Sequence, residues 1–232
     1  MVYCMSDIHG EYEKYRQMLD RLRFSENDTL YVLGDIIDRG PGGVEVLRHM
    51  MGQFNIVPLI GNHEYMALSC LRFLNREISE ESISALSSDD LTALLEWQRN
   101  GAQPTMDAFA KLCAEDRAAV LDYLGEFQLY EEVQAGGQDY VLVHAGLTGF
   151  DPRRPLDDYE LHEMIFECPY YGRVYYSDRY LVTGHLPTRA IPGNPNPDRI
   201  YRANRHIALD CGAGLGGVLG AICLDTGEEF YC

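Results

Sequence analysis

Aspartate, histidine and asparagine residues recur in short glycine-containing segments that directly follow β-rich runs of this sequence. The segments have the forms Asp-x-His, Gly-Asp, Gly-Asn-His and Gly-His, and His144 lies in a further segment, Val-His-Ala-Gly. Together they contain Asp7, His9, Asp35, Asn62, His63, His144 and His185. Carboxylate, imidazole and amide oxygen groups together suit borderline divalent ions such as manganese, iron or zinc. The absence of nearby cysteines argues against a structural zinc site and favours an open catalytic site.

These groups outnumber the four ligands that one tetrahedral ion takes, which indicates two ions. Two-metal sites hold their ions roughly 3.5–4 Å apart with a shared ligand between them, and Asp35 is the natural bridging residue. Each residue alone has an ordinary alternative, such as a helix N-cap for an aspartate after a strand. Coincidence is a poor explanation for the whole set. His49 and His162 lie in helical patterns and His206 opens a strand, so for these a structural role is preferred.

Strands and helices that could position these groups alternate in the first third of the chain. Strands are expected over Val2 to Met5, Leu30 to Leu33 and Phe54 to Ile60, with helices over Glu11 to Arg23 and Val44 to Met51. This βαβαβ order is typical of parallel strands joined by helical crossovers. Ligands of open α/β sheets bind outside the carboxyl ends of the strands, so the polar groups are expected to converge there.

The strand signal disappears from Glu64 to Glu126, where the sequence is rich in leucine, alanine and glutamate. This composition predicts a helical insertion over about residues 64–126. Strands are expected again at Tyr140 to Val143, Tyr180 to Val182, Ile207 to Leu209 and Val218 to Leu224. Because no linker of useful length interrupts the chain, residues 1–232 are expected to form a single domain.

Composition narrows the classes of partner. The formal net charge of -17 argues against nucleic acid, whose binding depends on lysine and arginine. No apolar run approaches the roughly 20 residues that span a bilayer, and no cleavable signal opens the chain, so we expect a cytoplasmic protein without a membrane partner. The seven cysteines show no C-x-x-C pair and are expected to be reduced structural thiols. The oligomeric state is left open.

Three segments resemble, in order and separation, the signature motifs of the phosphoprotein phosphatase family of calcineurin-like metallophosphoesterases. They are Ser6-Asp-Ile-His-Gly10, Gly34-Asp-Ile-Ile-Asp-Arg-Gly40 and Gly61-Asn-His-Glu64. Family features are also visible in Val143-His-Ala-Gly146, Gly184-His185 and Leu209-Asp-Cys-Gly-Ala-Gly214. The resemblance covers nearly the whole chain, and its short form is similar to bacterial and phage members and to dinucleoside polyphosphate hydrolases. It implies an α/β fold in which helices flank a central β-sandwich of mixed sheets.

The resemblance implies a role for each matching residue. Six residues would bind two divalent ions, expected to be manganese with iron and zinc as alternatives: Asp7 and His9 the first, Asp35 both, and Asn62, His144 and His185 the second. His63 would protonate the leaving oxygen with Asp38 orienting its imidazole, and Arg39 would grip phosphate oxygens. A metal-bridging hydroxide would attack phosphorus in line, without a phosphoenzyme.

One residue that the resemblance leads us to expect is missing. Similar proteins usually carry a second phosphate-binding arginine between the last two histidine ligands, where this chain reads Leu161-His-Glu-Met-Ile-Phe-Glu-Cys168. Arg173 or Arg179 are the candidates to replace it, and Arg153 or Arg154 could reach in from the loop after His144. Each of these arginines could equally be an ordinary surface residue.

Two aromatic segments have open roles. The Trp97-Gln-Arg-Asn-Gly-Ala102 segment with Thr105 is similar to a Trp…Gly-Gly…Thr segment of bacterial relatives and could edge the substrate pocket. Alternatively, Trp97 packs the core of the insertion. The run from Pro169 to Tyr176 could line the site with aromatic rings or be without function.

The favoured function is a metal-dependent phosphomonoesterase that acts on phosphoserine, phosphothreonine or phosphotyrosine of a phosphoprotein. The alternative is a dinucleoside polyphosphate hydrolase, with a phosphorylated small molecule as substrate. Because both would share every metal ligand, only the walls of the pocket can separate them. A metal-binding scaffold without activity is a remote third possibility, since a scaffold has no use for His63, Asp38 and Arg39 beside its metals.

Overall fold

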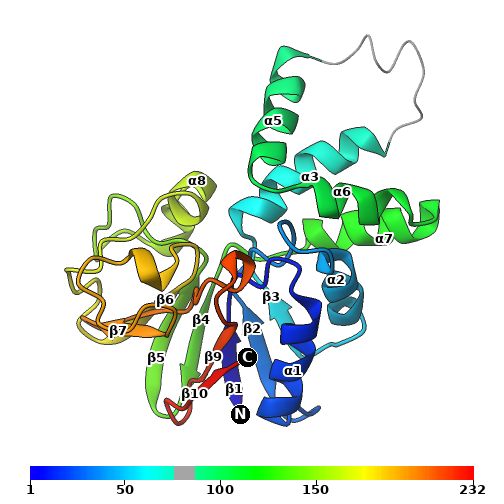
Figure 1. Ribbon diagram of the computed structural model, residues 1–232. Coiled ribbons are helices and arrows are strands. Elements are labelled where there is room, and N and C mark those ends of the chain that lie inside the picture. The colour runs from blue at the N-terminus through cyan, green and yellow to red at the C-terminus, as the bar shows by residue number, and fades with distance from the viewer. Residues whose placement is uncertain (76–86) are drawn as a thin grey trace.

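The computed structural model describes residues 1–75 and 87–232. Two five-stranded sheets pack as a sandwich that is flanked by helices (Figure 1). The first sheet has the strand order β10-β9-β1-β2-β3, and the second has the order β4-β5-β6-β8-β7. Each sheet contains parallel and antiparallel pairs. The predicted α/β sandwich of mixed sheets is therefore confirmed.

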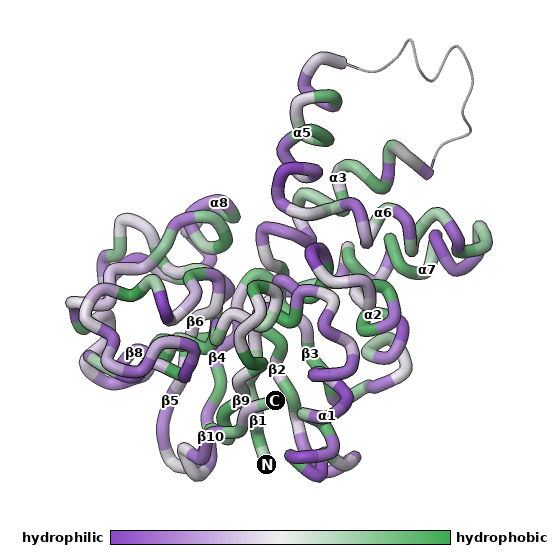
Figure 2. The backbone as a smooth tube through the Cα atoms, viewed as in Figure 1, coloured by the Kyte–Doolittle hydropathy of each residue, from purple (hydrophilic) through white to green (hydrophobic). Residues whose placement is uncertain are grey.

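The first sheet contains the predicted βαβαβ unit. Its parallel strands are β1 (Val2–Met5), β2 (Thr29–Val32) and β3 (Ile56–Pro58), connected by α1 (Tyr12–Leu22) and α2 (Gly43–Met51). The antiparallel strands β9 (Gly220–Cys223) and β10 (Glu229–Tyr231) complete the sheet. The three parallel strands are mostly hydrophobic (Figure 2), as expected for strands that are covered on both faces.

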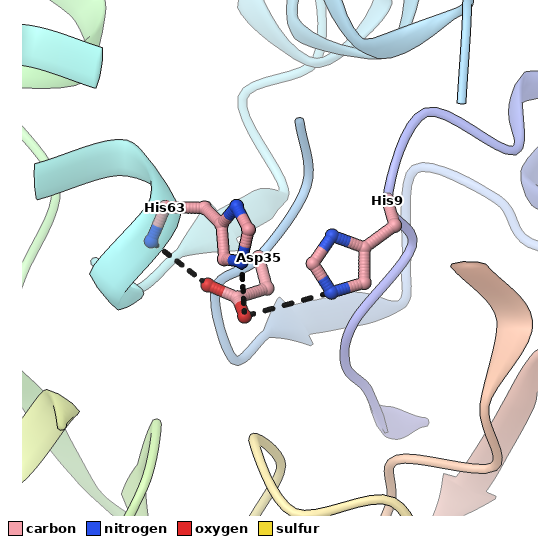
Figure 3. A group of neighbouring side chains, drawn as sticks. All are labelled: His9, Asp35 and His63. Atoms are coloured by element: carbon pink, nitrogen blue, oxygen red, sulfur yellow. Dashed lines mark hydrogen bonds and ion pairs between the residues drawn. The ribbon is translucent and has the colours of Figure 1, made fainter. Parts of the chain in front are cut away.

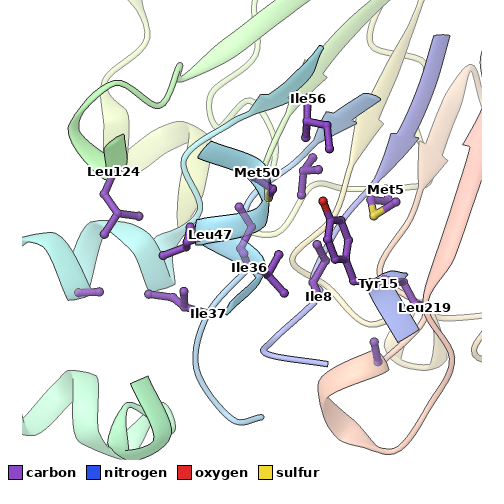
Figure 4. Packing of buried hydrophobic residues seen from close by; sticks show 14 of the residues in the cluster. Met5, Ile8, Tyr15, Ile36, Ile37, Leu47, Met50, Ile56, Leu124 and Leu219 are labelled. Atoms are coloured by element: carbon purple, nitrogen blue, oxygen red, sulfur yellow. The ribbon is translucent and has the colours of Figure 1, made fainter. Parts of the chain in front are cut away.

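The helices α1 and α2 bury one side against this sheet. Tyr15, Met18 and Leu22 of α1 are buried at spacings of three and four residues, which place them on one face of a helix. Leu47 and Met50 of α2 join the same hydrophobic cluster (Figure 4). This packing fixes where β1 and β2 end, and therefore where the loops after them begin.

The third strand is shorter than the predicted run from Phe54 to Ile60. Phe54 is 84% exposed and precedes the strand. After Pro58, the N–H of Leu59 still donates to the Val32 carbonyl at 2.8 Å, whereas the N–H of Ile60 donates to the Gln128 carbonyl at 2.8 Å. The chain therefore leaves the first sheet here and reaches toward the start of the second.

The second sheet supplies the remaining strand ends. Its strands are β4 (Tyr130–Ala135), β5 (Gln138–Val143), β6 (Arg179–Thr183), β7 (Tyr201–Ala203) and β8 (His206–Ala208). The strands β5, β6 and β8 run parallel, with β4 and β7 antiparallel at the two edges. A cluster between the sheets includes Leu33, Leu142 and Ile222. The carboxyl ends of β2 and β5 therefore lie close together, as the 2.6 Å contact between His144 Nδ1 and the Leu33 carbonyl shows.

Helices fill most of the chain between β3 and β4. They are α3 (Asn62–Leu74), α5 (Ser88–Arg99), α6 (Gln103–Ala110) and α7 (Ala114–Gly125), and they project beyond the sandwich (Figure 1). Residues 76–86 of the predicted insertion lie outside the described residues. Elsewhere the chain forms α8 (Leu161–Ile165) and short 3-10 turns at Leu156–Asp158, Thr188–Ala190 and Ala213–Leu215. The single-domain organisation stays a prediction.

All seven cysteines are free, and Cys4, Cys70, Cys211 and Cys223 are buried. Within residues 1–75 and 87–232, no helix has the length and apolar character that crossing a membrane requires.

His206 makes the stability of the fold depend on pH. It is 1% exposed, its Nε2 lies 2.9 Å from Thr183 Oγ1, and burial lowers its pKa to about 3. Between that value and the ordinary one the unfolded chain binds the extra proton, so stability is lost as pH falls below about 6.5. We expect the free energy of unfolding of His206→Gln to fall less steeply than that of the parent, by up to about 1.4 kcal/mol per pH unit. Urea unfolding at pH 7, 6 and 5 measures both slopes, and parallel slopes would contradict this role.

Candidate metal centre

The predicted polar residues meet at one edge of the sandwich, because each directly follows a strand. Asp7 and His9 lie in the loop after β1, and Asp35 follows β2. Asn62 and His63 open α3 just after β3, while His144 and His185 follow β5 and β6. All of these side chains except that of His185 are buried.

Asp35 lies at the centre of the cluster. Its Oδ1 is 3.4 Å from His144 Nε2, and its Oδ2 is 3.6 Å from His9 Nε2 and 3.8 Å from His63 Nε2. Figure 3 shows the carboxylate between His9 and His63. Gly61 allows this close approach, since a Cβ there would lie 2.3 Å from Asp35 Oδ1. One carboxylate thus faces two groups of ligands, which is the geometry that a bridging residue needs.

The first group lies on the His9 side. His9 Nε2 is 3.9 Å from Asp7 Oδ1, and Asp7 Oδ2 accepts hydrogen bonds from Ser6 Oγ at 2.5 Å and from the N–H of His185 at 3.0 Å. Asp7 Oδ1 is buried and has no hydrogen-bond partner among the described residues. Burial, with Asp210 and Asp35 nearby, raises the pKa of Asp7 well above its ordinary value. A cation at Oδ1 would relieve this clustering of buried carboxylates, so these residues fit a divalent ion.

The second group lies on the opposite side of Asp35. Asn62 Oδ1 is 3.0 Å from both His144 Nε2 and His185 Nδ1, and the two imidazole rings are 5.1 Å apart. His144, His185 and Asp35 offer ligand atoms within 4.8 Å of one another. With the amide oxygen of Asn62, this is a four-ligand set of the kind that a divalent ion binds. The donor chemistry on both sides therefore fits two ions.

Electrostatics separates the histidines of the cluster. Burial lowers the pKa of His9 to about 3 and that of His185 to about 4, and it also lowers the pKa of His144. Neutral imidazoles keep the lone pair that binds a metal. His63 differs: burial lowers its pKa, but the carboxylates of Asp35 and Asp38 outweigh burial and raise it.

His63 forms a dyad with Asp38. The His63 Nδ1 lies 2.7 Å from Asp38 Oδ2, and its Nε2 lies 3.3 Å from Nη2 of the exposed Arg39. His9, Asp35 and His63 are also close enough to one another to share an ion. The guanidinium beside His63 Nε2 disfavours a divalent ion at that nitrogen more than it disfavours a single proton, because the repulsion grows with the charge. The arrangement suits a proton donor better than a ligand.

The loops that carry the site have a strained backbone. Of the ten non-glycine residues with positive φ in the described chain, six belong to the site: Asp7, His9, Asp35, Asp38, Arg39 and His185. Each such conformation costs about 1–3 kcal/mol and persists only where the surroundings enforce it. Backbone hydrogen bonds supply part of that support, as the N–H of His9 donates to the Asp35 carbonyl at 2.9 Å.

Glu64 stabilises the loop around Asp35 through hydrogen bonds to its backbone, a role that the Gly-Asn-His-Glu motif alone did not reveal. Its side chain is 0% exposed and accepts hydrogen bonds from the N–H groups of Asp35, Ile36, Ile37 and Gly61 at 2.7–3.3 Å. In Glu64→Gln an NH₂ group would face these donors, so we expect the free energy of unfolding to fall by about 1–3 kcal/mol. Denaturant unfolding measures the loss, and Glu126→Gln, at an exposed position, is the matched control.

Asp210 is a second buried carboxylate whose function the sequence did not identify, although its segment resembles the family. It is 2% exposed, its Oδ1 accepts a hydrogen bond from the N–H of Gly212 at 2.8 Å, and its Oδ2 lacks a partner among the described residues. Burial raises its pKa to about 6. Its proximity to Asp7 adds negative charge on the side of the first group.

The structure does not bring the candidate second arginine to the cluster. Arg179 opens β6, at the opposite end from His185, and pairs with Glu132. The guanidinium of Arg173 lies 5.1 Å from the centre of the Phe150 ring, and Arg153 and Arg154 pair with Asp151 and Glu163. Among these five arginines, Arg39 is the one that contacts a residue of the cluster.

The two aromatic segments have different surroundings. Trp97 and Thr105 both donate hydrogen bonds to Asp38, so neither sequence-level interpretation of Trp97 was complete. In the run from Pro169 to Tyr176, Tyr171 is buried and stacks on His206 with ring centres 4.5 Å apart. Tyr175 is also buried, and Tyr170 is exposed. Tyr171 and Tyr175 therefore pack against the second sheet, whereas residues 172–174 are exposed.

Comparisons with known proteins agree with this geometry. Residues 1–208 match the family model of the calcineurin-like phosphoesterases. A symmetrical bis(5'-nucleosyl)-tetraphosphatase of Erwinia tasmaniensis is 33% identical in an alignment of 140 residues, and the match covers 51% of this chain and 51% of the relative. Its namesake in Acidovorax ebreus is 30% identical over 148 residues, 63% of this chain and 44% of the relative. The chain thus spans about half the length of these relatives.

A solved structure is similar over the whole chain. It belongs to a protein provisionally named a diadenosine tetraphosphatase, and it superposes with a TM-score of 0.67 at 19% identity. The similarity covers 100% of this chain and 92% of the other. At that identity it supports the fold alone. The match to the family model, together with this fold and the clustered Asp, Asn and His side chains, shows that the chain belongs to the calcineurin-like phosphoesterase family.

Proposed function

We propose that this protein is a metal-dependent phosphoesterase that hydrolyses dinucleoside polyphosphates. The observation that carries this choice is the 30–33% identity to relatives named symmetrical bis(5'-nucleosyl)-tetraphosphatases. The favoured prediction from the sequence, a protein phosphatase, would use the same cluster. It now ranks second, because the names of these relatives support the alternative.

The residues of the cluster have separate tasks in this proposal. Two divalent ions held by Asp7, His9, Asp35, Asn62, His144 and His185 would supply activated water and neutralise phosphate charge. Arg39 is exposed beside His63 and can bind phosphate oxygens through its planar set of donors. His63 then protonates the leaving oxygen, and the Asp38 carboxylate at Nδ1 keeps the opposite nitrogen, Nε2, facing the cluster around Asp35.

The missing second arginine is compatible with this substrate class. A polyphosphate chain has several bridging and terminal oxygens, so it can contact the ions and Arg39 at more than one phosphate. A phosphomonoester offers a single phosphoryl group for all of these contacts.

The test compares substrates side by side. The purified chain with manganese is incubated with diadenosine tetraphosphate and with phosphoserine, phosphothreonine and phosphotyrosine peptides. Symmetrical cleavage gives ADP as the single nucleotide product, which chromatography separates from AMP and ATP. We expect kcat/KM to be at least about tenfold higher for the dinucleotide, which corresponds to about 1.4 kcal/mol. Faster phosphate release from a peptide would return the protein phosphatase to first place.

A further inference from the structure

The helices α5 and α6 of the predicted insertion, which begins after His63 at about residue 64, reach the candidate site through Asp38. This side chain is 0% exposed, and its Oδ2 accepts hydrogen bonds from His63 Nδ1 and from Trp97 Nε1, both at 2.7 Å. Its Oδ1 accepts from the Thr105 hydroxyl at 2.6 Å, and the Asp38 N–H donates back to that hydroxyl oxygen at 3.0 Å. Two of the three donors to the carboxylate therefore come from the insertion.

Both donors are buried side chains in helices of the insertion. Trp97 is 0% exposed near the end of α5, and Thr105 is 3% exposed in the first turn of α6. Although Trp97 also belongs to the hydrophobic core, its N–H points at a carboxylate of the dyad. A carboxylate with donors on both oxygens cannot rotate freely, so the oxygen that faces His63 is fixed.

The same corner of the insertion holds the neighbouring arginine. Asp38 and Arg39 have φ values of +70° and +66°, which side chains other than glycine rarely adopt. The N–H of Arg39 donates to the Gly101 carbonyl at 2.9 Å, between α5 and α6. Gly101 has a φ of +100°, and a Cβ there would lie 3.0 Å from Arg39 Cγ. The insertion thus stabilises two consecutive strained residues of the site.

We propose that Trp97 and Thr105 are positioning residues for the His63–Asp38 dyad. They hold the Asp38 carboxylate in the orientation that keeps its hydrogen bond to His63 Nδ1. The carbonyl of Gly101 fixes the backbone of Arg39 by accepting a hydrogen bond from its N–H. This inference rests on the proposed function. The inference gives the segment from Trp97 to Thr105 a role in the reaction, whereas the sequence suggested only the edge of the pocket or, for Trp97, the core of the insertion.

The experiment uses variants that delete single donors. Thr105→Val and Trp97→Phe each remove one hydrogen bond to Asp38 and keep most of the side-chain volume, and Thr105→Ser keeps the hydroxyl. Thr92→Val is the matched control, because Thr92 is exposed in α5 and its hydroxyl donates to the Ser88 carbonyl, at 2.9 Å. Diadenosine tetraphosphate hydrolysis with manganese gives kcat and KM. Proton NMR of the protein loaded with diamagnetic zinc follows the low-field signal of His63 Nδ1–H, which is identified by its loss in His63→Asn.

For Thr105→Val and Trp97→Phe we expect kcat to fall by about 10–100-fold with KM changed less than about threefold. The His63 signal should shift upfield and exchange faster, Thr105→Ser should recover most of kcat, and Thr92→Val should match the parent. An unchanged His63 signal in both deletion variants would overturn the proposal, as would a serine variant as slow as valine. If the parent hydrolyses no dinucleotide while the signal still responds, the proposed function fails and the positioning contact stands.

Discussion

Replacing Asp35 with asparagine is expected to remove both metal ions and to lower phosphoester hydrolysis by at least about 10³-fold. The Asp35 carboxylate faces both groups of ligands, with His9 and His144 within 3.6 Å of its two oxygens. Burial alone would raise the pKa of Asp35, but the surrounding histidines outweigh burial and hold it below its ordinary value. The Asp35 carboxylate is therefore negatively charged, whereas the amide of an asparagine at this position carries no charge.

The measurement is metal content after dialysis against manganese, determined together with the rate. The parent should retain two ions per chain and Asp35→Asn fewer than one. Asp122→Asn, at an exposed position of α7, is the matched control and should behave as the parent. Chelation of the parent should abolish hydrolysis, and added manganese should restore it. Two ions bound by Asp35→Asn would refute the bridging assignment.

Replacing His63 with asparagine is expected to lower kcat by about 10²–10⁴-fold while both ions stay bound. Asparagine can still donate a hydrogen bond to Asp38, so the loop should keep its shape. What it lacks is a proton to give to the leaving oxygen. The loss is therefore expected in kcat, with little change in KM.

Metal content decides between the two roles that the geometry allows for His63. A proton donor can be removed without loss of metal, whereas a ligand shared with His9 and Asp35 cannot. Loss of one ion in His63→Asn would therefore make His63 a ligand. His162→Asn is the control, because His162 is exposed in α8 and its ring stacks on Phe166 with centres 4.9 Å apart.

The sequence predicted the parallel strands well and the edges of the sheets poorly. The strand β1 is mostly buried, β2 alternates between buried and half-buried residues, and β5 ends in the buried run Tyr140 to Val143, so their patterns are visible locally. The edge strands β4, β7 and β10 were missed. The first contains Glu131 and Glu132, and the other two have three residues each, so none of them shows a long apolar pattern. Their pairing depends on a neighbour that is distant in the chain.

The clustering of these side chains around Asp35 was predictable because each follows a strand within a few residues. In a sheet with parallel strands, position at a carboxyl end in the sequence becomes proximity in space. The positions of the arginine side chains could not be predicted from the order of the strands in the same way. The partners of Arg179 and Arg154, Glu132 and Glu163, are contributed by other elements, and those contacts keep both side chains away from the cluster.

The sequence by itself determined the fold class, the family and the residue types gathered around Asp35. Tertiary structure decided how those residues are supported. Trp97 and Thr105 are 59 and 67 positions from Asp38, and no periodicity or motif connects them to it. Such contacts arise only when the insertion packs against the loop after β2, because hydrogen bonds form between groups that are close in space, whatever their separation in the chain.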